Sequence, residues 1–200
     1  MNRTIIRLDT SHREAAAATL AAAFHDDPAM VWLLPDAASR PPRLTALCRW
    51  MVGEHLANGM VLGTPGCQVV TLWRPPGKVH VHEPLWHPGA LRFIPIFRRL
   101  LLRALRIDDA IRAHLPSDEA WLYLKMAGVR PDCQGKRLGG LAIRAGLAEA
   151  ERLGVRGVLE TATPSNVGLY QRLGFVTRSE WQVPGGGPRF WTMTHQGPQA

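Results

Sequence analysis

Hydrophobic positions after residue 120 change their period several times, and each change marks a predicted element. Runs of branched and aromatic residues predict buried strands. Apolar residues at spacings of three and four, with charged residues between them, predict amphipathic helices. Gly154 and Gly174 follow the two helical patterns, as expected of residues that end helices. Strands and helices are therefore predicted to alternate, over residues 121–129, 138–153, 156–163, 166–173 and from Phe175 onward.

The N-terminal part has patterns that predict supporting elements. Ser11 is followed three residues later by Glu14, the capping-box signature of a helix start, and an Ala- and Leu-rich run continues from there. Pro28 is expected to mark the exit from this helix. A first strand, a second helix and a two-stranded hairpin are predicted over residues 4–10, 40–57 and 60–73.

A turn rich in glycine and cationic residues joins the strand that ends at Val129 to the following helix, and it reads QGKRLGG over residues 134–140. Unpaired N–H groups and the positive end of the helix dipole meet there, and small residues let an anion approach the backbone. The spacing matches neither the P-loop nor the dinucleotide fingerprint. The turn is therefore predicted to hold a phosphate-bearing ligand in a loop of another type.

This turn and the segment after it together resemble the GCN5-related N-acetyltransferase (GNAT) family. The acyl-CoA loop of that family is Gln/Arg-x-x-Gly-x-Gly/Ala; Gln134 and Gly139 match it, and Arg137 stands where the first glycine is commonest. Asn166 and Tyr170 follow in NVGLYQRLGF, about 30 residues later and in the order that the family uses. Pieces along nearly the whole chain, such as AAAFHDDP, VVTLWRPPG and FWTMT, resemble the puromycin N-acetyltransferase branch.

The resemblance implies an α/β (α+β) architecture. The expected GNAT fold has a central mixed, mostly antiparallel sheet that is splayed between its two central strands, with helices on both faces. A single N-acetyltransferase domain is expected over residues 1–200, with the cofactor half at about 121–178 and an acceptor-side helical segment at about 84–116. The resemblance thins between Val79 and Leu115, so the identity of the acceptor does not transfer.

The resemblance also implies a cofactor and the residues that bind it. Acetyl-CoA is expected as the acyl donor. The expected cofactor-binding residues are Ala127, Gly128, Val129, Gln134, Gly135, Lys136, Arg137, Leu138, Gly139, Gly140, Asn166 and Tyr170. Arg137 keeps its N–H available if its backbone is right-handed, whereas a conformation open only to glycine would exclude it.

Direct acetyl transfer to an amine needs a proton donor for the departing thiolate and a neutral amine. Tyr170 is expected to be the general acid, because a phenol holds its proton at neutral pH. Relatives carry a glutamate where this chain has Lys125, so the base is assigned either to Glu160 or to a water chain. Backbone N–H groups from Ala127 to Val129 are expected to hold the thioester carbonyl if the strands splay.

Composition narrows the class of protein. The chain has 200 residues, three cysteines and a net charge of +8. The basic excess is spread along the chain without interleaved aromatic residues, so an anionic cofactor is favoured over nucleic acid. The cysteines fit no metal-ligand spacing, and Cys133 is interpreted as a small buried filler of the turn. A cytoplasmic, reduced protein, monomeric or homodimeric, with no metal and no stable membrane insertion, is predicted.

Two further segments have alternative interpretations. Residues 91–115 carry a basic face and an apolar face interrupted by Pro95; a packed helix pair that lids the acceptor pocket is favoured over a membrane-binding surface. The run HVHEPLWH carries His80, His82 and His87 with Glu83, and a pocket wall or loop is favoured there over a metal pair.

The sequence therefore predicts an N-acetyltransferase that transfers acetyl from acetyl-CoA to a primary amine of a small molecule, with an antibiotic-like or an amino-acid-like amine as the candidates. One alternative is a non-catalytic acyl-CoA-binding regulatory module. Another is an acetyltransferase that acts on a protein amine. A nucleic-acid-associated acetyltransferase is a further alternative, and it predicts binding that weakens steeply with salt.

Overall fold

A computed structural model describes residues 3–78, 93–97 and 100–195 of the chain. Their strands form one seven-stranded sheet in the order β1-β2-β3-β4-β5-β7-β6. β4 and β5 pair in parallel, and the other neighbours pair antiparallel. The strands are β1 (Ile6–Arg7), β2 (Met60–Gly63), β3 (Val69–Arg74), β4 (Trp121–Val129), β5 (Arg156–Thr161), β6 (Phe175–Gln182) and β7 (Arg189–His195).

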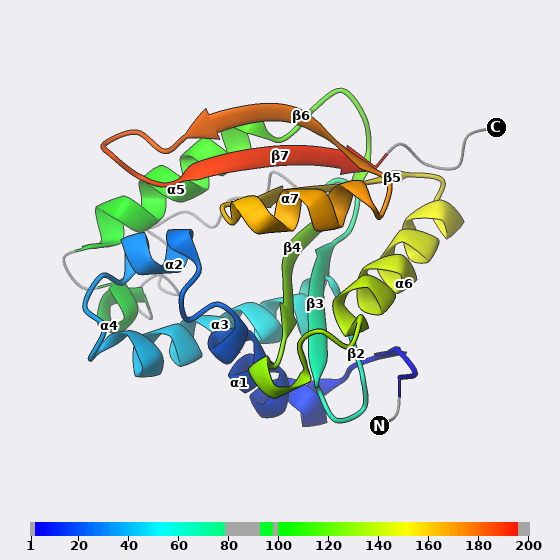
Figure 1. Ribbon diagram of the computed structural model, residues 1–200, viewed down its shortest axis with the longest axis horizontal. Coiled ribbons are helices and arrows are strands. Elements are labelled where there is room, and N and C mark those ends of the chain that lie inside the picture. Colours follow the sequence, from blue (N-terminus) through cyan, green and yellow to red (C-terminus); the bar gives the residue numbers. More distant parts are fainter. Residues whose placement is uncertain (1–2, 79–92, 98–99, 196–200) are drawn as a thin grey trace.

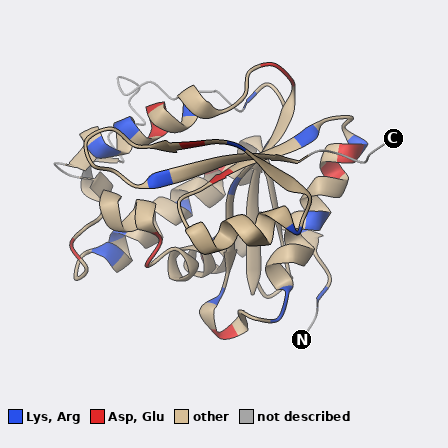
Figure 2. Cartoon of the chain, turned by 45° about the horizontal axis from the view of Figure 1, so that its top comes forward, with Lys and Arg blue, Asp and Glu red and all other residues tan. Residues whose placement is uncertain are grey.

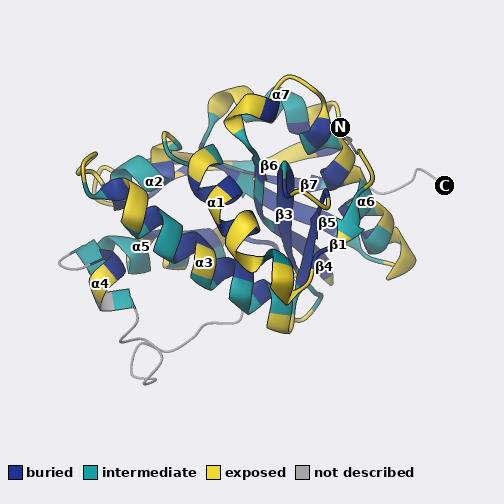
Figure 3. Ribbon diagram, turned by 90° about the horizontal axis from the view of Figure 1, so that it is seen from below, coloured by how far each residue is buried: buried dark blue, intermediate teal, exposed yellow. Residues whose placement is uncertain are grey.

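Helices cover both faces of this sheet (Figure 1). One face carries helices from the first 114 residues, and the other carries the two later helices, α6 and α7 (Figure 3). The predicted mixed, mostly antiparallel sheet with helices on both faces is confirmed. The helices are α1 (Arg13–Ala23), α2 (Pro28–Leu33), α3 (Arg40–Asn58), α4 (Ile94–Phe97), α5 (Leu101–His114), α6 (Leu138–Arg152) and α7 (Pro164–Gln171), with 3₁₀ turns η1 (Thr10–His12) and η4 (Pro131–Cys133).

The predicted elements of the C-terminal half match those observed within two residues at most ends. Gly154 and Gly174 both have left-handed φ angles, +67° and +90°, and follow α6 and α7 as predicted. The hairpin of β2 and β3 and the helix predicted over 40–57 are also confirmed. Strong hydrophobic periodicity was therefore a sufficient guide to these elements.

The N-terminal capping prediction is wrong. Asp9, not Ser11, caps the first turn: its side chain accepts the Ser11 N–H at 2.9 Å, and it caps η1 rather than α1. Glu14 is instead ion-paired with Arg49 of α3 at 2.7 Å. Pro28 does not mark an exit either, because it is the first residue of α2, where the missing proline N–H is harmless.

A β-bulge interrupts β4 at Lys125. Leu72 of β3 faces Met126, the next residue Trp73 faces Leu124, and Lys125 between them has no partner on β3. The inserted residue reverses the alternation of the strand, since Trp121 and Tyr123 share a core cluster with Met126 rather than with residue 125. The bulge thus turns Met126 toward the face that carries α1, α3 and α5.

The two central strands separate at the same point. β4 and β5 pair from Trp121–Arg156 to Leu124–Leu159 and no further, whereas β4 continues to Val129 along β3. β5 continues to Thr161 along β7. The expected splay between the central strands is therefore present, and it starts directly beside the bulge.

The segment expected to lie on the acceptor side contains α4, which includes Pro95, and α5. Residues 79–92, which hold His80, His82, Glu83, His87 and the first part of that segment, lie outside the described residues. Ile107 and Ile111 of α5 are buried, whereas Leu102 on the same helix is 65% exposed. α5 therefore packs one face inward, as the lid interpretation predicted.

Candidate functional site

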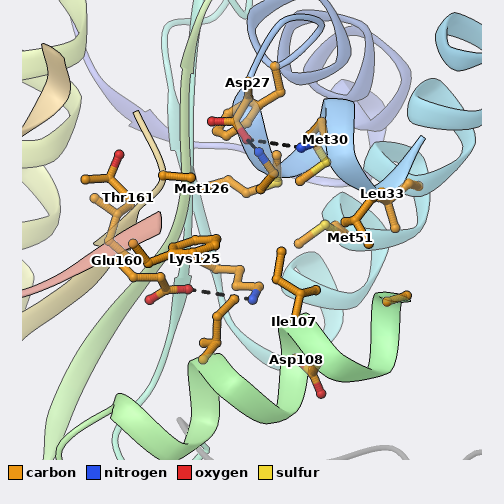
Figure 4. Close-up of a pocket in the computed structure, with 18 of the residues that line it drawn as sticks. Asp27, Met30, Leu33, Met51, Ile107, Asp108, Lys125, Met126, Glu160 and Thr161 are labelled. Atoms are coloured by element: carbon orange, nitrogen blue, oxygen red, sulfur yellow. Dashed lines mark hydrogen bonds and ion pairs between the residues drawn. The ribbon is translucent and has the colours of Figure 1, made fainter. Parts of the chain in front are cut away.

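A cavity of about 470 Å³ lies at the splay of the sheet. Residues of both core clusters line it, including Met126 from the first and Leu124 and Tyr170 from the second. The cavity therefore connects the two faces of the sheet through the opening between β4 and β5. Figure 4 shows Glu160 and Lys125 on one side of it, with Met30, Leu33 and Met51 of α2 and α3, and Ile107 and Asp108 of α5, around the remainder.

Three polar side chains from neighbouring strands meet at this opening. The Tyr123 hydroxyl donates a hydrogen bond to Oε1 of Glu160, and Nζ of Lys125 lies 3.3 Å from that hydroxyl and 3.9 Å from the same carboxylate oxygen. The Glu160 side chain is only 4% exposed. Its second oxygen, Oε2, is buried and has no hydrogen-bond partner among the described residues.

Burial shifts the pKa values in this cluster in opposite directions. It raises the pKa of Glu160 above its usual value of 4.5, against the attraction of Lys125 and the hydrogen bond from Tyr123. It lowers the pKa of Lys125, against the attraction of Glu160. Both shifts favour the state in which Glu160 is protonated and Lys125 is neutral. When it is deprotonated, the Glu160 carboxylate is therefore a stronger base than an exposed glutamate.

Tyr170 and Asn166 lie four residues apart on α7, on the same helix face, and both line the cavity. The Tyr170 ring packs edge-on against Phe175, with ring centroids 5.9 Å apart. Burial, followed by the charges of Glu160 and Asp27, raises the pKa of the Tyr170 phenol above its usual value of 10. The phenol therefore keeps its proton at any working pH, as a proton donor requires.

Ala127, Gly128 and Val129 lie on the part of β4 that has left β5. Backbone groups on that edge have no β-ladder partner from β5, so they face the opening. A side chain at Gly128 would meet α1, because an added Cβ would lie 2.9 Å from Leu20 and 3.0 Å from Ala23. In the antiparallel ladder with β3, alternate residues of this stretch turn their main-chain groups away from β3 and toward the splay.

The predicted phosphate turn forms the entry to α6. The first intrahelical hydrogen bond is donated by the Leu141 N–H to the Arg137 carbonyl, at 3.3 Å. The N–H groups of Leu138, Gly139 and Gly140 precede it and lie at the positive end of a 15-residue helix. Leu138 itself is buried, so only its backbone faces a ligand. This end of α6 has the arrangement that binds anions.

Two side chains of the turn stabilise the loop itself. Gln134 donates to the Val129 carbonyl at 3.3 Å, and Lys136 donates to the Asp132 carbonyl at 2.9 Å. Gly135 has a left-handed φ of +74°, with open space where a side chain would lie. Cys133 is fully buried beneath the turn, in agreement with its interpretation as a filler.

Arg137 has φ +62° and ψ +14°, which is the left-handed and not the right-handed region. The right-handed backbone expected of an arginine at this position is therefore absent. An L-residue there is strained by about 1–2 kcal/mol. Arg137 nevertheless occupies the N-cap of α6, so a glycine-favouring conformation does not exclude it.

Arg144 and Arg172 were missed by the sequence argument. With Arg137 they line a hollow between α6 and α7, whose floor includes Leu141 and Leu173. None of the three arginine side chains forms an ion pair or hydrogen bond with another described residue. Arg152 on the same helix, in contrast, is paired with Glu149 at 2.6 Å. The helical spacing of 137, 141 and 144 was visible in the sequence, but the approach of Arg172 was not.

Asp27 was also missed. Its carboxylate accepts the Ala29 and Met30 N–H groups at 2.9 and 3.3 Å and caps α2, and it accepts the Thr163 hydroxyl at 3.0 Å. Burial raises its pKa despite these hydrogen bonds. Asp before Pro is a recognisable helix start, but the bond to the turn before α7 links residues 136 positions apart.

Charge is distributed over the molecule rather than gathered in one region. Figure 2 shows Lys and Arg on helices, strands and loops, with Asp and Glu between them. None of the described helices is both long and apolar enough to span a membrane. Within the described ranges, no group of three His, Cys, Asp or Glu side chains is arranged to hold a metal ion.

Comparison with known proteins agrees with this geometry. Residues 102–175, which include β4, the turn, α6, β5 and α7, match the model of the acetyltransferase (GNAT) family. An uncharacterized N-acetyltransferase of Schizosaccharomyces pombe is 26% identical over 204 residues, which cover 89% of this chain and 79% of that protein. Over residues 102–175 the chain is thus similar to the GNAT family. This match and the curated N-acetyltransferase relative support an acyltransferase, and a closer resemblance to the puromycin N-acetyltransferase branch stays a prediction.

Solved structures show the same fold. A Corynebacterium glutamicum structure described as histone acetyltransferase HPA2 and related acetyltransferase has a TM-score of 0.73 and 20% identity, and the match covers 98% of this chain and 97% of that one. Arylalkylamine N-acetyltransferase 2 of Aedes aegypti has a TM-score of 0.61 and 15% identity, with 96% and 97% coverage. At these identities the comparison defines the fold of this protein and leaves its acceptor open.

Proposed function

We propose that this protein transfers the acetyl group of acetyl-CoA directly to a primary amine of a small molecule. The observation that carries the proposal is the cavity at the splay, which Tyr170, Asn166 and Glu160 all line. Residues 1–200 act as one N-acetyltransferase domain in this proposal. Acetyl-CoA supplies a thioester, whose carbonyl carbon accepts a nucleophile and whose thiolate leaves.

The residues at the splay have complementary roles. A nitrogen–carbon bond forms as the carbon–sulfur bond breaks. Glu160 accepts the proton that the amine loses, and Tyr170 donates a proton to sulfur. Backbone N–H groups of Ala127 to Val129 stabilise the carbonyl oxygen. A buried carboxylate with a raised pKa and a buried phenol with its proton in place suit these two proton transfers.

The cofactor half fits a molecule with a phosphorylated end and a thiol end. The N–H groups ahead of Leu141 suit the pyrophosphate, and Asn166 is placed beside the opening to contact the pantetheine arm. The hollow with Arg137, Arg144 and Arg172 combines cationic groups with an apolar floor, which suits a phosphorylated nucleoside. The unpaired arginines beside the helix end support acetyl-CoA as donor.

The two alternatives to this proposal are a protein amine as acceptor and a non-catalytic acyl-CoA-binding module. Similar structures include an agmatine N-acetyltransferase, and also the ribosomal-protein-S18-alanine N-acetyltransferase of Escherichia coli, so the fold does not choose between small and protein amines. The lining of the cavity by α2, α3, α4 and α5 favours a small molecule, because a protein terminus needs an open path to the splay. A buried proton donor and base beside the opening disfavour a non-catalytic module.

A panel of amines tests the proposal. Release of free CoA from acetyl-CoA is followed with a thiol reagent, in parallel with calorimetric binding of CoA, and the products are identified by mass spectrometry. Release that depends on both the amine and the enzyme is expected. Tight binding of CoA without release for any amine would instead establish the regulatory module, and acetylation of peptides alone would establish a protein acceptor.

A further inference from the structure

We infer that the acceptor of this enzyme is a primary amine with a single cationic end and an apolar, aromatic-sized body, rather than a polyamine or an amino acid. The inference rests on the proposed function and specifies the substrate class of the same cavity. Its basis is the unequal distribution of free polar groups and apolar side chains over the cavity wall.

The amine end is assigned to Glu160. Glu160 lines the cavity; its Oε2 is buried and has no described hydrogen-bond partner, whereas Oε1 accepts a hydrogen bond from Tyr123. A buried acceptor atom without a partner is costly, and an N–H donor of the acceptor removes that cost. Because Tyr170 lines the same cavity, an amine bound there lies near the expected position of the thioester.

The wall away from the splay is apolar and aromatic. α2, α3, α4 and α5 contribute to it, and Figure 4 shows Met30, Leu33, Met51 and Ile107 grouped around the end of the cavity. Farther along, the wall includes Trp50, whose ring meets Phe93 edge-on with centroids 4.7 Å apart. An apolar body gains free energy by leaving water for this wall, and a charged one loses free energy.

The other carboxylates on the wall already have partners. Asp27 accepts two backbone N–H groups and the Thr163 hydroxyl. Glu54 lies 3.0 Å from the imidazole of His55, and Asp108 lies 3.4 Å from Arg112. A second ammonium on the acceptor would have to share one of these carboxylates with its existing partners. Diamines and polyamines are therefore disfavoured.

The cations on the wall are balanced in a similar way. Arg74 and Lys78 lie near Glu54, and their charges help to lower its pKa. Lys125 faces Glu160. An acceptor carboxylate, as in a free amino acid, would have to compete with these protein carboxylates, while its own charge would be desolvated among apolar side chains. An acceptor with a neutral, apolar body avoids both of these costs.

The test compares acceptors that differ in one feature at a time. The kcat/KM values of 2-phenylethylamine, putrescine and phenylalanine are measured with acetyl-CoA at saturation. Phenylalanine adds only a carboxylate to phenylethylamine, and putrescine replaces the ring with a second ammonium. We expect phenylethylamine to exceed each of the others at least about 30-fold, since an unpaired buried charge discriminates more strongly than a missing methylene.

Two positions on α5 provide a matched pair of variants. Leu105 is half-buried and lines the cavity, whereas Leu102 is 65% exposed on the same helix. Leu105→Glu places a carboxylate on the apolar wall, and we expect it to lower kcat/KM for phenylethylamine at least about 10-fold and to shift the preference toward putrescine. Leu102→Glu is expected to leave both values within about 2-fold. Met30→Glu on α2 repeats the test if the α5 variant unfolds, as judged by circular dichroism.

The outcomes distinguish a failure of the inferred acceptor class from a failure of the proposed acetyltransferase function. CoA release with equal or better use of putrescine or phenylalanine overturns the apolar acceptor and leaves the proposed function intact. An unchanged preference in folded Leu105→Glu and Met30→Glu also overturns it. Absence of release with every amine contradicts the proposed function as well.

Discussion

The two faces of the sheet carry the two halves of the proposed site, and they are built in different ways. On the α6 and α7 face, the site consists largely of main-chain groups at helix ends and strand edges, with side chains from one stretch of about 50 residues. On the α3 and α5 face, the cavity wall consists of side chains from elements spread between Phe24 and Phe190.

This difference explains why one half is easy to recognise and the other is not. Main-chain sites depend on where a helix starts and on which small residues stand there, and both leave local patterns in the sequence. A cavity lined by side chains depends on which faces of distant helices meet. Many different sequences can form such a cavity equally well. The donor side is thus general to the fold, whereas the acceptor side belongs to this chain.

The largest expected effect is that of Tyr170→Phe. The ring would keep its packing against Phe175, but no proton would reach sulfur, so we expect kcat to fall about 100-fold or more. Affinity for CoA, measured by calorimetry, is expected to stay within about 3-fold because the hydroxyl serves the transition state. An unchanged kcat would remove the acid role of Tyr170.

A smaller loss is expected for Glu160→Gln, about 10- to 100-fold in kcat/KM. The base acts only when deprotonated, so kcat/KM of the wild-type enzyme should fall as the pH decreases through an apparent pKa above 4.5, the direction in which burial shifts this carboxyl. That acidic limb should be absent in the variant. Glu119→Gln is the control, because Glu119 is ion-paired with Arg156 at the surface. A water chain as base predicts the same pH profile for both enzymes.

The arginine hollow tests the donor side at moderate magnitude. The double variant Arg144→Gln with Arg172→Gln is expected to raise KM for acetyl-CoA about 3- to 10-fold, with kcat unchanged, and to weaken the salt dependence of KM. With acetyl-3′-dephospho-CoA as the donor, most of the difference in KM between the wild-type enzyme and the double variant should disappear. Arg152→Gln, on the same helix but paired with Glu149, should leave KM unaltered. Equal effects of the double variant and Arg152→Gln would show that the hollow does not contact the cofactor.

The smallest expected effect concerns the left-handed residue of the turn. Glycine at position 137 relieves the strain that any L-residue has there, so Arg137→Gly should exceed Arg137→Ala in unfolding free energy by about 1 kcal/mol. Both variants lack the same side-chain charge, so they should share one KM for acetyl-CoA. Urea denaturation measures the difference. Equal stabilities would mean that the turn adjusts to its occupant.

Individual elements show how far prediction from the sequence extends. The strand over 121–129, the helix after Leu138 and the roles of Gly154 and Gly174 followed from periodicity and from residues that end helices. The cap at Ser11 failed because Asp9, two residues earlier, offers a carboxylate to the same turn. Local patterns thus identified the elements reliably and their ends less reliably.

The sequence by itself determined the order of strands and helices, the glycine-rich turn and the presence of Asn166 and Tyr170 after it, because each depends on residues close in the chain. The tertiary structure alone decided the bulge at Lys125, the separation of β4 from β5 and the partners of Glu160. It also brought Asp27 to Thr163 and Arg172 to Arg137. These features depend on the register of paired strands and on the packing of distant helices, which no local pattern encodes.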